Sequence, residues 1–325
     1  MRIISLLFIL AWCFVPVIVD AQTDELNHMV ADLAWSPDGL LLAAATSRTL
    51  RVYDTTDWDA PPVVLDIGEY VTRSITFSPD GQLLAVGKAD GAQLWDVTTW
   101  EQTAQLPNND APVLFTPDGE RLVTGYHGLQ IWNLQNTQWL DSFGDYYWAV
   151  VIALSPDGKL AAIGNAGEGA HLWDVEAGEI LLPLNAAPDK FDFSPDGTLL
   201  AWAQSKQLVL WDVMLQEGRW VVEVDGSTNT DIVLGIDFSP NSEIVAAQEW
   251  SGLLLLVDTT SGDVLDTQET HLPTPTNAIF GYPVAFSPDG MLLATGGADG
   301  VVKIWSVSAE AAISGPLATL DDDPP

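Results

Sequence analysis

Ser78-Pro79-Asp80-Gly81, followed by Leu94-Trp95-Asp96-Val97, is the stretch of sequence that decides the fold. Both parts recur in the same order along the chain. Copies or near copies of the first part stand at 36–39, 116–119, 155–158, 194–197, 239–242 and 287–290. Their seven prolines are separated by 42, 38, 39, 39, 45 and 48 residues. Internal similarity at a fixed period of this kind indicates a protein built from repeated structural units.

The second part of the marker follows each of these prolines by 15 to 17 residues. Its centre is a tryptophan in most units, with a tyrosine or a valine in the others. A large flat side chain offers a broad surface for packing against a neighbouring sheet. We therefore expect one structural residue on the third strand of each unit: Tyr53, Trp95, Trp132, Trp173, Trp211, Val257 and Trp305.

Each unit has the pattern of a small antiparallel sheet. An alternating apolar run, such as Ile75 and Phe77, ends at a proline, which removes a donor from the hydrogen-bond ladder. Asp80-Gly81 suits a tight hairpin, in which glycine adopts positive φ freely. Small residues such as those at 85–87 then fit a second strand crowded toward the axis of a ring. No segment has helical periodicity, so the sequence predicts an all-β fold, a seven-bladed β-propeller of four-stranded antiparallel sheets.

The paired markers resemble those of the WD-repeat (Trp-Asp repeat) family of β-propellers over residues 28–321. The family often has a Gly-His pair before the first strand and an aspartate after the second, which join the tryptophan in a buried hydrogen-bond network. No Gly-His pair occurs here, and the aspartate is clear only as Asp90 and Asp299. We therefore expect few such networks and blades held together mainly by apolar packing. The resemblance implies blades at approximately 28–68, 69–107, 108–144, 145–185, 186–226, 227–270 and 271–321.

Closure of the ring is a separate question. In the family an N-terminal strand often completes the last blade, whereas here the first blade follows almost directly after the N-terminal lead. Residues 315–320 resemble the last blade's own fourth strand. We expect the ring to close by side-chain packing alone, with a supporting part for residues 22–26 as the alternative.

The two ends of the chain lie outside the repeats. Arg2 precedes an almost wholly apolar stretch at 3–19, and small residues at Val19 and Ala21 suit cleavage after residue 21. Cleavage would remove Cys13, the single cysteine, and leave no disulfide framework and no membrane span. We expect a secreted, periplasmic or cell-surface protein of bacterial origin, with a retained membrane anchor as the alternative. The chain is divided into a signal peptide at 1–21, an N-terminal lead at 22–27, the propeller at 28–321 and a tail at 322–325.

The charge limits the class of partner. The chain has 45 Asp and Glu against 11 Lys and Arg, a formal net charge of −34. Such a surface repels polyanions, so we set nucleic acids and anionic membrane surfaces aside. The acidity favours a cationic partner, with a merely solubilising surface as the alternative.

Catalytic and metal-binding motifs do not stand out. The sequence contains neither His-Glu-x-x-His nor Gly-x-Ser-x-Gly. Oxygen-bearing side chains at Asp225, Ser227, Asn229 and Asp231 alternate as in a calcium loop, but a glycine at the sixth position and a glutamate at the twelfth are missing. A polar loop is the favoured interpretation. We therefore predict no catalytic residue, no metal, no cofactor and no enzymatic activity.

The functional prediction concerns what we call the loop face. On this face of the propeller the loops between blades and the turns between second and third strands gather. Loops held on a rigid scaffold commonly carry recognition, and Tyr, Trp and Arg dominate binding hot spots. We predict that the chain is a scaffold that binds a protein or peptide, possibly cationic. The candidate partner-binding residues are Tyr70, Arg73, Tyr146, Tyr147, Trp148, Trp250 and Tyr282.

Other interpretations stay open at this point. Some of these aromatic residues could pack between blades, and Trp58 and Trp100 could form a second patch on the opposite face or cover the outer strands. A propeller enzyme or a cofactor- or metal-binding protein would instead act on a small molecule at the central channel. A structural module of a cell-envelope assembly is the third alternative.

Overall fold

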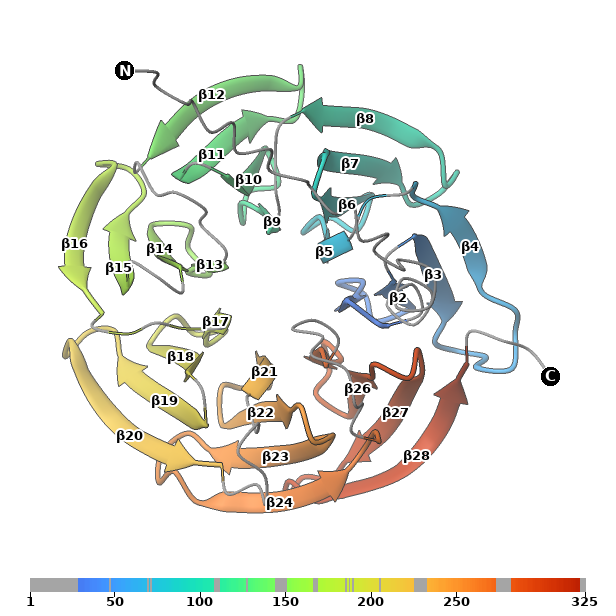
Figure 1. Ribbon diagram of the computed structural model, residues 1–325, viewed down its shortest axis with the longest axis vertical. Helices are drawn as coiled ribbons and strands as arrows, with labels where there is room; N and C mark the ends of the chain where they lie inside the picture. Colours follow the sequence, from blue (N-terminus) through green and yellow to red (C-terminus); the bar gives the residue numbers. More distant parts are fainter. Residues whose placement is uncertain are drawn as a thin grey trace, which may run out of the picture.

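A computed structural model shows seven four-stranded antiparallel sheets arranged around a central axis (Figure 1). The prediction of an all-β, seven-bladed propeller is confirmed. No helix that could cross a membrane occurs in the described part of the chain. The structure describes residues 29–46, 48–68, 70, 72–107, 112–126, 128–143, 151–165, 169–184, 186, 188, 190–204, 206–224, 233–272 and 282–321.

The blades, numbered one to seven in chain order, each use four consecutive strands. Blade one has β1 (Asp32–Trp35), β2 (Leu41–Ala45), β3 (Thr49–Asp54) and β4 (Val63–Asp66). Blade two has β5 (Thr72–Phe77), β6 (Leu83–Lys88), β7 (Gly91–Asp96) and β8 (Gln102–Pro107). Blade three has β9 (Val113–Phe115), β10 (Arg121–Tyr126), β11 (Gly128–Asn133) and β12 (Gln138–Phe143). Blade four has β13 (Val151–Leu154), β14 (Leu160–Asn165), β15 (Gly169–Asp174) and β16 (Glu179–Pro183).

The other three blades repeat this order. Blade five has β17 (Lys190–Phe193), β18 (Leu199–Gln204), β19 (Gln207–Asp212) and β20 (Glu217–Glu223). Blade six has β21 (Val233–Phe238), β22 (Ile244–Glu249), β23 (Leu253–Asp258) and β24 (Val264–Glu269). Blade seven has β25 (Val284–Phe286), β26 (Leu292–Gly296), β27 (Val302–Val307) and β28 (Ile313–Leu320). Each sheet falls within one of the expected blade ranges.

Burial changes from the axis outward. The first strand of each blade lies innermost and the fourth lies on the circumference (Figure 1). The second strands are almost wholly buried, so most of their residues are small or apolar, as in β2 and in residues 244–247 of β22. The fourth strands alternate between exposed and half-buried positions, as in β24. A strand enclosed on both faces has no room for polar alternation, which explains the runs of alanine that the sequence shows.

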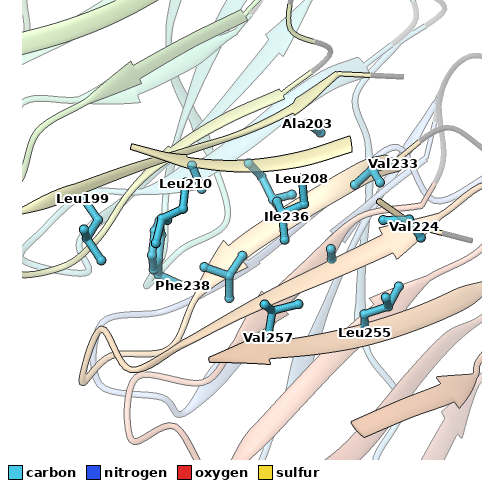
Figure 2. Packing of buried hydrophobic residues seen from close by; sticks show 13 residues of the cluster. Leu199, Ala203, Leu208, Leu210, Val224, Val233, Ile236, Phe238, Leu255 and Val257 are labelled. Atoms are coloured by element: carbon cyan, nitrogen blue, oxygen red, sulfur yellow. The ribbon is translucent and has the colours of Figure 1, made fainter. Parts of the chain in front are cut away.

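Apolar side chains fill the space between neighbouring blades. Figure 2 shows one such cluster, in which Leu208 and Leu210 of blade five face Ile236, Phe238 and Val257 of blade six. The seven third-strand residues are all buried at interfaces of this kind. Their exposed fractions are 5% for Tyr53, 8% for Trp95, 8% for Trp132, 7% for Trp173, 7% for Trp211, 0% for Val257 and 2% for Trp305.

The third-strand residue packs toward the preceding blade. Trp305 of blade seven clusters with Leu254 and Leu256 of blade six, and Tyr53 of blade one clusters with Ile304 of blade seven. The first and last blades are therefore joined by the same contact that joins the others.

The Ser-Pro-Asp-Gly turns link the blades a second time. In blade two, the Ser78 hydroxyl donates to Asp80 Oδ1 (2.6 Å) and accepts from the Leu83 amide (2.9 Å). The hydrogen bond from Ser78 holds the pKa of Asp80 below its usual value. Gly81 adopts φ +70°, and a Cβ there would lie 3.6 Å from Pro37 in the turn of blade one. The Ser-Pro-Asp-Gly turn that recurs along the sequence thus also forms a contact between neighbouring blades.

Ring closure uses packing and no exchanged strand among the described residues. β28 pairs with β27 and completes blade seven by itself. Side chains of blade one, including Val30 and Leu33, cluster with those of blade seven, including Leu320. The Val30 amide donates to the Gly297 carbonyl (3.1 Å), and Trp35 Nε1 donates to the Ala285 carbonyl (3.0 Å). Closure therefore uses side-chain packing, as expected, together with these two hydrogen bonds. The alternative, a supporting part for residues 22–26, lies outside the described residues.

A complete polar network occurs in blade seven. His271 Nδ1 lies 3.2 Å from Asp299 Oδ1, His271 Nε2 lies 3.0 Å from Thr295 Oγ1, and Trp305 Nε1 donates to the same oxygen (2.9 Å). A neutral imidazole with its proton on Nδ1 satisfies every partner, because the carboxylate accepts and the Thr295 hydroxyl donates to Nε2. Burial would raise the pKa of Asp299, but the hydrogen bond from His271 holds it below its usual value. From the sequence, only Asp299 could be assigned to this network. His271 was not recognised, because Thr270 precedes it where the family has glycine.

Replacing His271 by alanine is expected to lower the free energy of unfolding by about 1–3 kcal/mol, because Asp299 and the Thr295 hydroxyl each lose a buried partner. Urea unfolding at neutral pH measures the effect. An unchanged midpoint would show that the network does not stabilise blade seven.

Candidate binding site: the central channel and its loop-face rim

The innermost strands of all seven blades surround a channel of about 790 Å³. These strands have an unpaired edge that faces the axis, so their amide groups need partners other than a neighbouring strand. The wall is mainly apolar and includes aromatic rings, but five charged residues also line it. They are Asp32, Arg73, Lys190, Asp192 and Asp237.

Three of these charged residues are aspartates that hold inner strands together. The Ile75 amide of blade two donates to Asp32 of blade one (2.8 Å). The Phe238 amide of blade six donates to Asp192 of blade five (3.0 Å). In each case a carboxylate accepts a hydrogen bond from a backbone amide on the free edge of the next blade's inner strand. Asp32 and Asp192 therefore connect neighbouring blades by hydrogen bonds in the channel wall.

The third carboxyl extends the same arrangement to blade seven, where the Phe286 amide donates to Asp237 (2.6 Å). Asp192 and Asp237 also hydrogen-bond to each other. Burial raises the pKa of Asp192 to about 7. Burial and the nearby charge of Asp192 raise the pKa of Asp237 well above its usual value. Both aspartates are half-buried in the channel wall.

Three of the predicted partner-binding residues meet at this channel. Arg73, Trp250 and Tyr282 all line it, from blades two, six and seven. Arg73 and Trp250 are half-buried. Tyr282 is 1% exposed, packs with Met29 and Ala298, and donates to the Leu272 carbonyl (3.4 Å). The expectation that Tyr282 is presented at the surface is therefore not met, because its ring belongs to the packing beneath the rim.

Tyr70 is presented to solvent near the same end of the ring. Its side chain is 55% exposed, and Lys88 Nζ lies 6.0 Å from the ring centroid. The ammonium of Lys88 donates to the Ile67 carbonyl, which also accepts from Gln93 Nε2 (3.1 Å). Burial lowers the pKa of Lys88. An ammonium group at about 6 Å from an aromatic ring centroid is attracted by the ring's electrons.

Other predicted site residues lie outside the described residues. These are the aromatic residues Tyr146, Tyr147 and Trp148, and the weak metal candidates Asp225, Ser227, Asn229 and Asp231. Within the described ranges, no group of three or more His, Cys, Asp or Glu side chains is arranged to hold a metal ion.

On the opposite face, Trp58 and Trp100 are half-buried. Trp58 meets Trp35 edge to face, with ring centroids 6.2 Å apart. Trp100 packs against the cluster between blades one and two. Their contacts favour the interpretation that they cover the blades.

The acidic residues of the channel wall are the part of the site that the sequence reasoning missed. Their signal is visible in Phe191-Asp192-Phe193 and Ile236-Asp237-Phe238. In both, a carboxylate interrupts an apolar strand just before the Ser-Pro turn. A charged residue among core residues at equivalent positions of two repeats indicates a specific partner.

Comparisons with known proteins agree with this architecture. A family model described as "WD domain, G-beta repeat" matches residues 22–54 and 284–306. Telomerase protein component 1 of Rattus norvegicus is 31% identical over 157 residues, which is 47% of this chain and 6% of that protein. The protein of the same name from Mus musculus matches with the same identity and coverage. The matched segment is thus a small part of each relative.

The fold and its repeats define a seven-bladed β-propeller with repeats similar to the WD domain, G-beta repeat. The similarity detected by the family model falls in the first and last blades, which meet where the ring closes.

Proposed function

We propose that the chain is a non-enzymatic scaffold that binds a protein or peptide at the loop-face end of its channel. Propellers with WD repeats commonly mediate protein interactions. The observation that carries the proposal is that Arg73 of blade two and Trp250 of blade six both line the channel, while Tyr70, also of blade two, is exposed. Aromatic and arginine side chains are enriched among binding hot spots, and a rigid frame reduces the cost of ordering the surface that presents them.

The charge of the chain supports a partner with a cationic segment. A net charge of −34 creates a field that accelerates association with a basic protein and weakens in salt. The apolar stretch at 3–19 supports a secreted, periplasmic or cell-surface location as part of the same proposal. The similarity to telomerase protein component 1 supports the scaffold role only through the shared repeats.

The test is capture of a partner by the immobilised chain from secreted proteins, at low and high salt. The double variant Tyr70→Ala/Trp250→Ala is expected to reduce the affinity for the captured protein at least tenfold. Hot-spot anchors contribute about 2 kcal/mol each, and a tenfold change needs only about 1.4 kcal/mol.

Met214→Ala is the matched control. Met214 is 82% exposed and lies in the turn between the third and fourth strands of blade five, on the opposite face. It should leave capture unchanged. Thermal unfolding of both variants separates binding from stability. A double variant that binds like the wild type, or one that loses stability and binding together, would refute the assignment of these residues to the binding surface.

A further inference from the structure

Asp192 and Asp237 occupy equivalent positions of β17 and β21, each one residue before the aromatic residue that precedes a Ser-Pro turn. Their carboxyls hydrogen-bond to each other, and each also accepts the amide of the next inner strand. Blades five, six and seven are therefore connected along the channel by one continuous set of hydrogen bonds. This pair plays no part in the proposed binding of a partner at the rim.

Few charged groups surround the pair. Lys190 on β17 and Asp32 on β1 line the same channel, as does Arg73 on β5. Lys190 lowers the pKa of both carboxyls, though less than burial raises it. Among the strands packed against β17 and β21, only β22 carries another titratable residue. That residue is Glu249, which is buried and accepts from the Ser251 hydroxyl (3.0 Å). The strands β13, β18 and β25 contain none.

Two carboxylates in hydrogen-bond contact in a half-buried channel wall cannot both ionise at low cost. A shared proton removes one charge and serves as the hydrogen of the bond between them, so the pair titrates as a unit. We propose that Asp192 and Asp237 share one proton and form a pH-sensitive latch, which holds blades five, six and seven together and weakens when the proton is lost.

The sign of the change in stability with pH follows because the folded protein keeps this proton up to a higher pH than the unfolded chain does. The pKa of Asp192 in the folded protein, about 7, lies above the value of an aspartate in an unfolded chain. The stabilisation is fully present below the unfolded value and is lost as the pH rises through 7. The propeller should therefore be more stable in mild acid than in mild base, and most of the change should fall on the acid side of pH 7.

The experiment is urea unfolding of the purified chain between pH 5.5 and 8.5 at constant ionic strength. For the wild type we expect the folding equilibrium constant to fall by about tenfold across this range. The key variant is Asp192→Asn. Its amide oxygen can still accept the Phe238 amide and its NH₂ can donate to Asp237, so it imitates the protonated pair at every pH. We expect Asp192→Asn to reduce this pH dependence at least threefold.

The control is Glu120→Gln, which removes one negative charge from an exposed position and should retain the wild-type dependence. This comparison separates the latch from general repulsion among acidic groups. A second readout is the NMR titration of the aspartate carboxyl carbons, where one resonance should titrate near neutral pH and disappear in Asp192→Asn.

If Asp192→Asn does not fold, Asp237→Asn offers the same comparison from the other side of the pair. A wild-type stability that does not fall across the range would overturn the latch. So would an Asn variant that keeps the full wild-type dependence, or a spectrum with no such resonance.

Discussion

Trp305→Ala lowers the free energy of unfolding by about 3–5 kcal/mol, as expected when a large aromatic side chain is removed from a well-packed interior. Trp305 is 2% exposed and packs between blades six and seven. Its indole nitrogen also donates to Thr295, so the substitution leaves a cavity and breaks the network around His271. Because the domain as a whole is stable by only about 5–15 kcal/mol, a large part of its stability is lost. Urea unfolding followed by tryptophan fluorescence and circular dichroism measures it.

Trp139→Ala is the matched control for this prediction. Trp139 lies on β12, at the circumference, and is 56% exposed. It fills no interior space, so its loss is expected to change stability by about 0.5 kcal/mol or less. If the two variants were destabilised equally, the third-strand tryptophans would not be the interblade contacts described above.

Gly252→Ala is the second substitution with a large expected effect. Gly252 adopts φ +81°, and a Cβ there would run into the backbone of His271. The left-handed conformation costs a residue with a Cβ about 1–2 kcal/mol, and forced overpacking adds about 1–3 kcal/mol. Together these give a loss of about 2–5 kcal/mol, which chemical denaturation measures.

Gly39→Ala separates the two causes. Gly39 has a similar φ of +73°, but its nearest neighbour to a new Cβ is Pro288 at 3.6 Å, an ordinary contact. This variant should lose only the conformational part, about 1–2 kcal/mol. Equal losses in the two variants would show that the backbone of His271 yields to the added methyl group.

The fold could be predicted because its determinants are local and repeated. Each Ser-Pro-Asp-Gly turn is a self-contained structure, closed by the bond from Ser78 to Asp80 in blade two and by equivalents elsewhere. Each third-strand aromatic residue needs only a neighbouring sheet. Since every blade packs against its neighbour through the same kinds of residue, seven copies of the pattern specify the ring.

The polar contacts between blades were harder to predict, because they join residues far apart in the sequence. His271 and Asp299 are 28 positions apart, and the usual glycine before the histidine is replaced by Thr270. The latch at Asp192 and Asp237 depends on amides of the next blade, which no local pattern reveals. For the candidate site, the sequence named aromatic residues in loops but could not tell which of them are buried, as Tyr282 shows.

A crystal structure of the purified chain tests the central claim most directly. Our account predicts seven four-stranded sheets around one channel, with Leu320 packed against blade one and Asp192 in contact with Asp237. Six or eight blades, two separate lobes, or a last blade completed by a strand from the N-terminal region would contradict it.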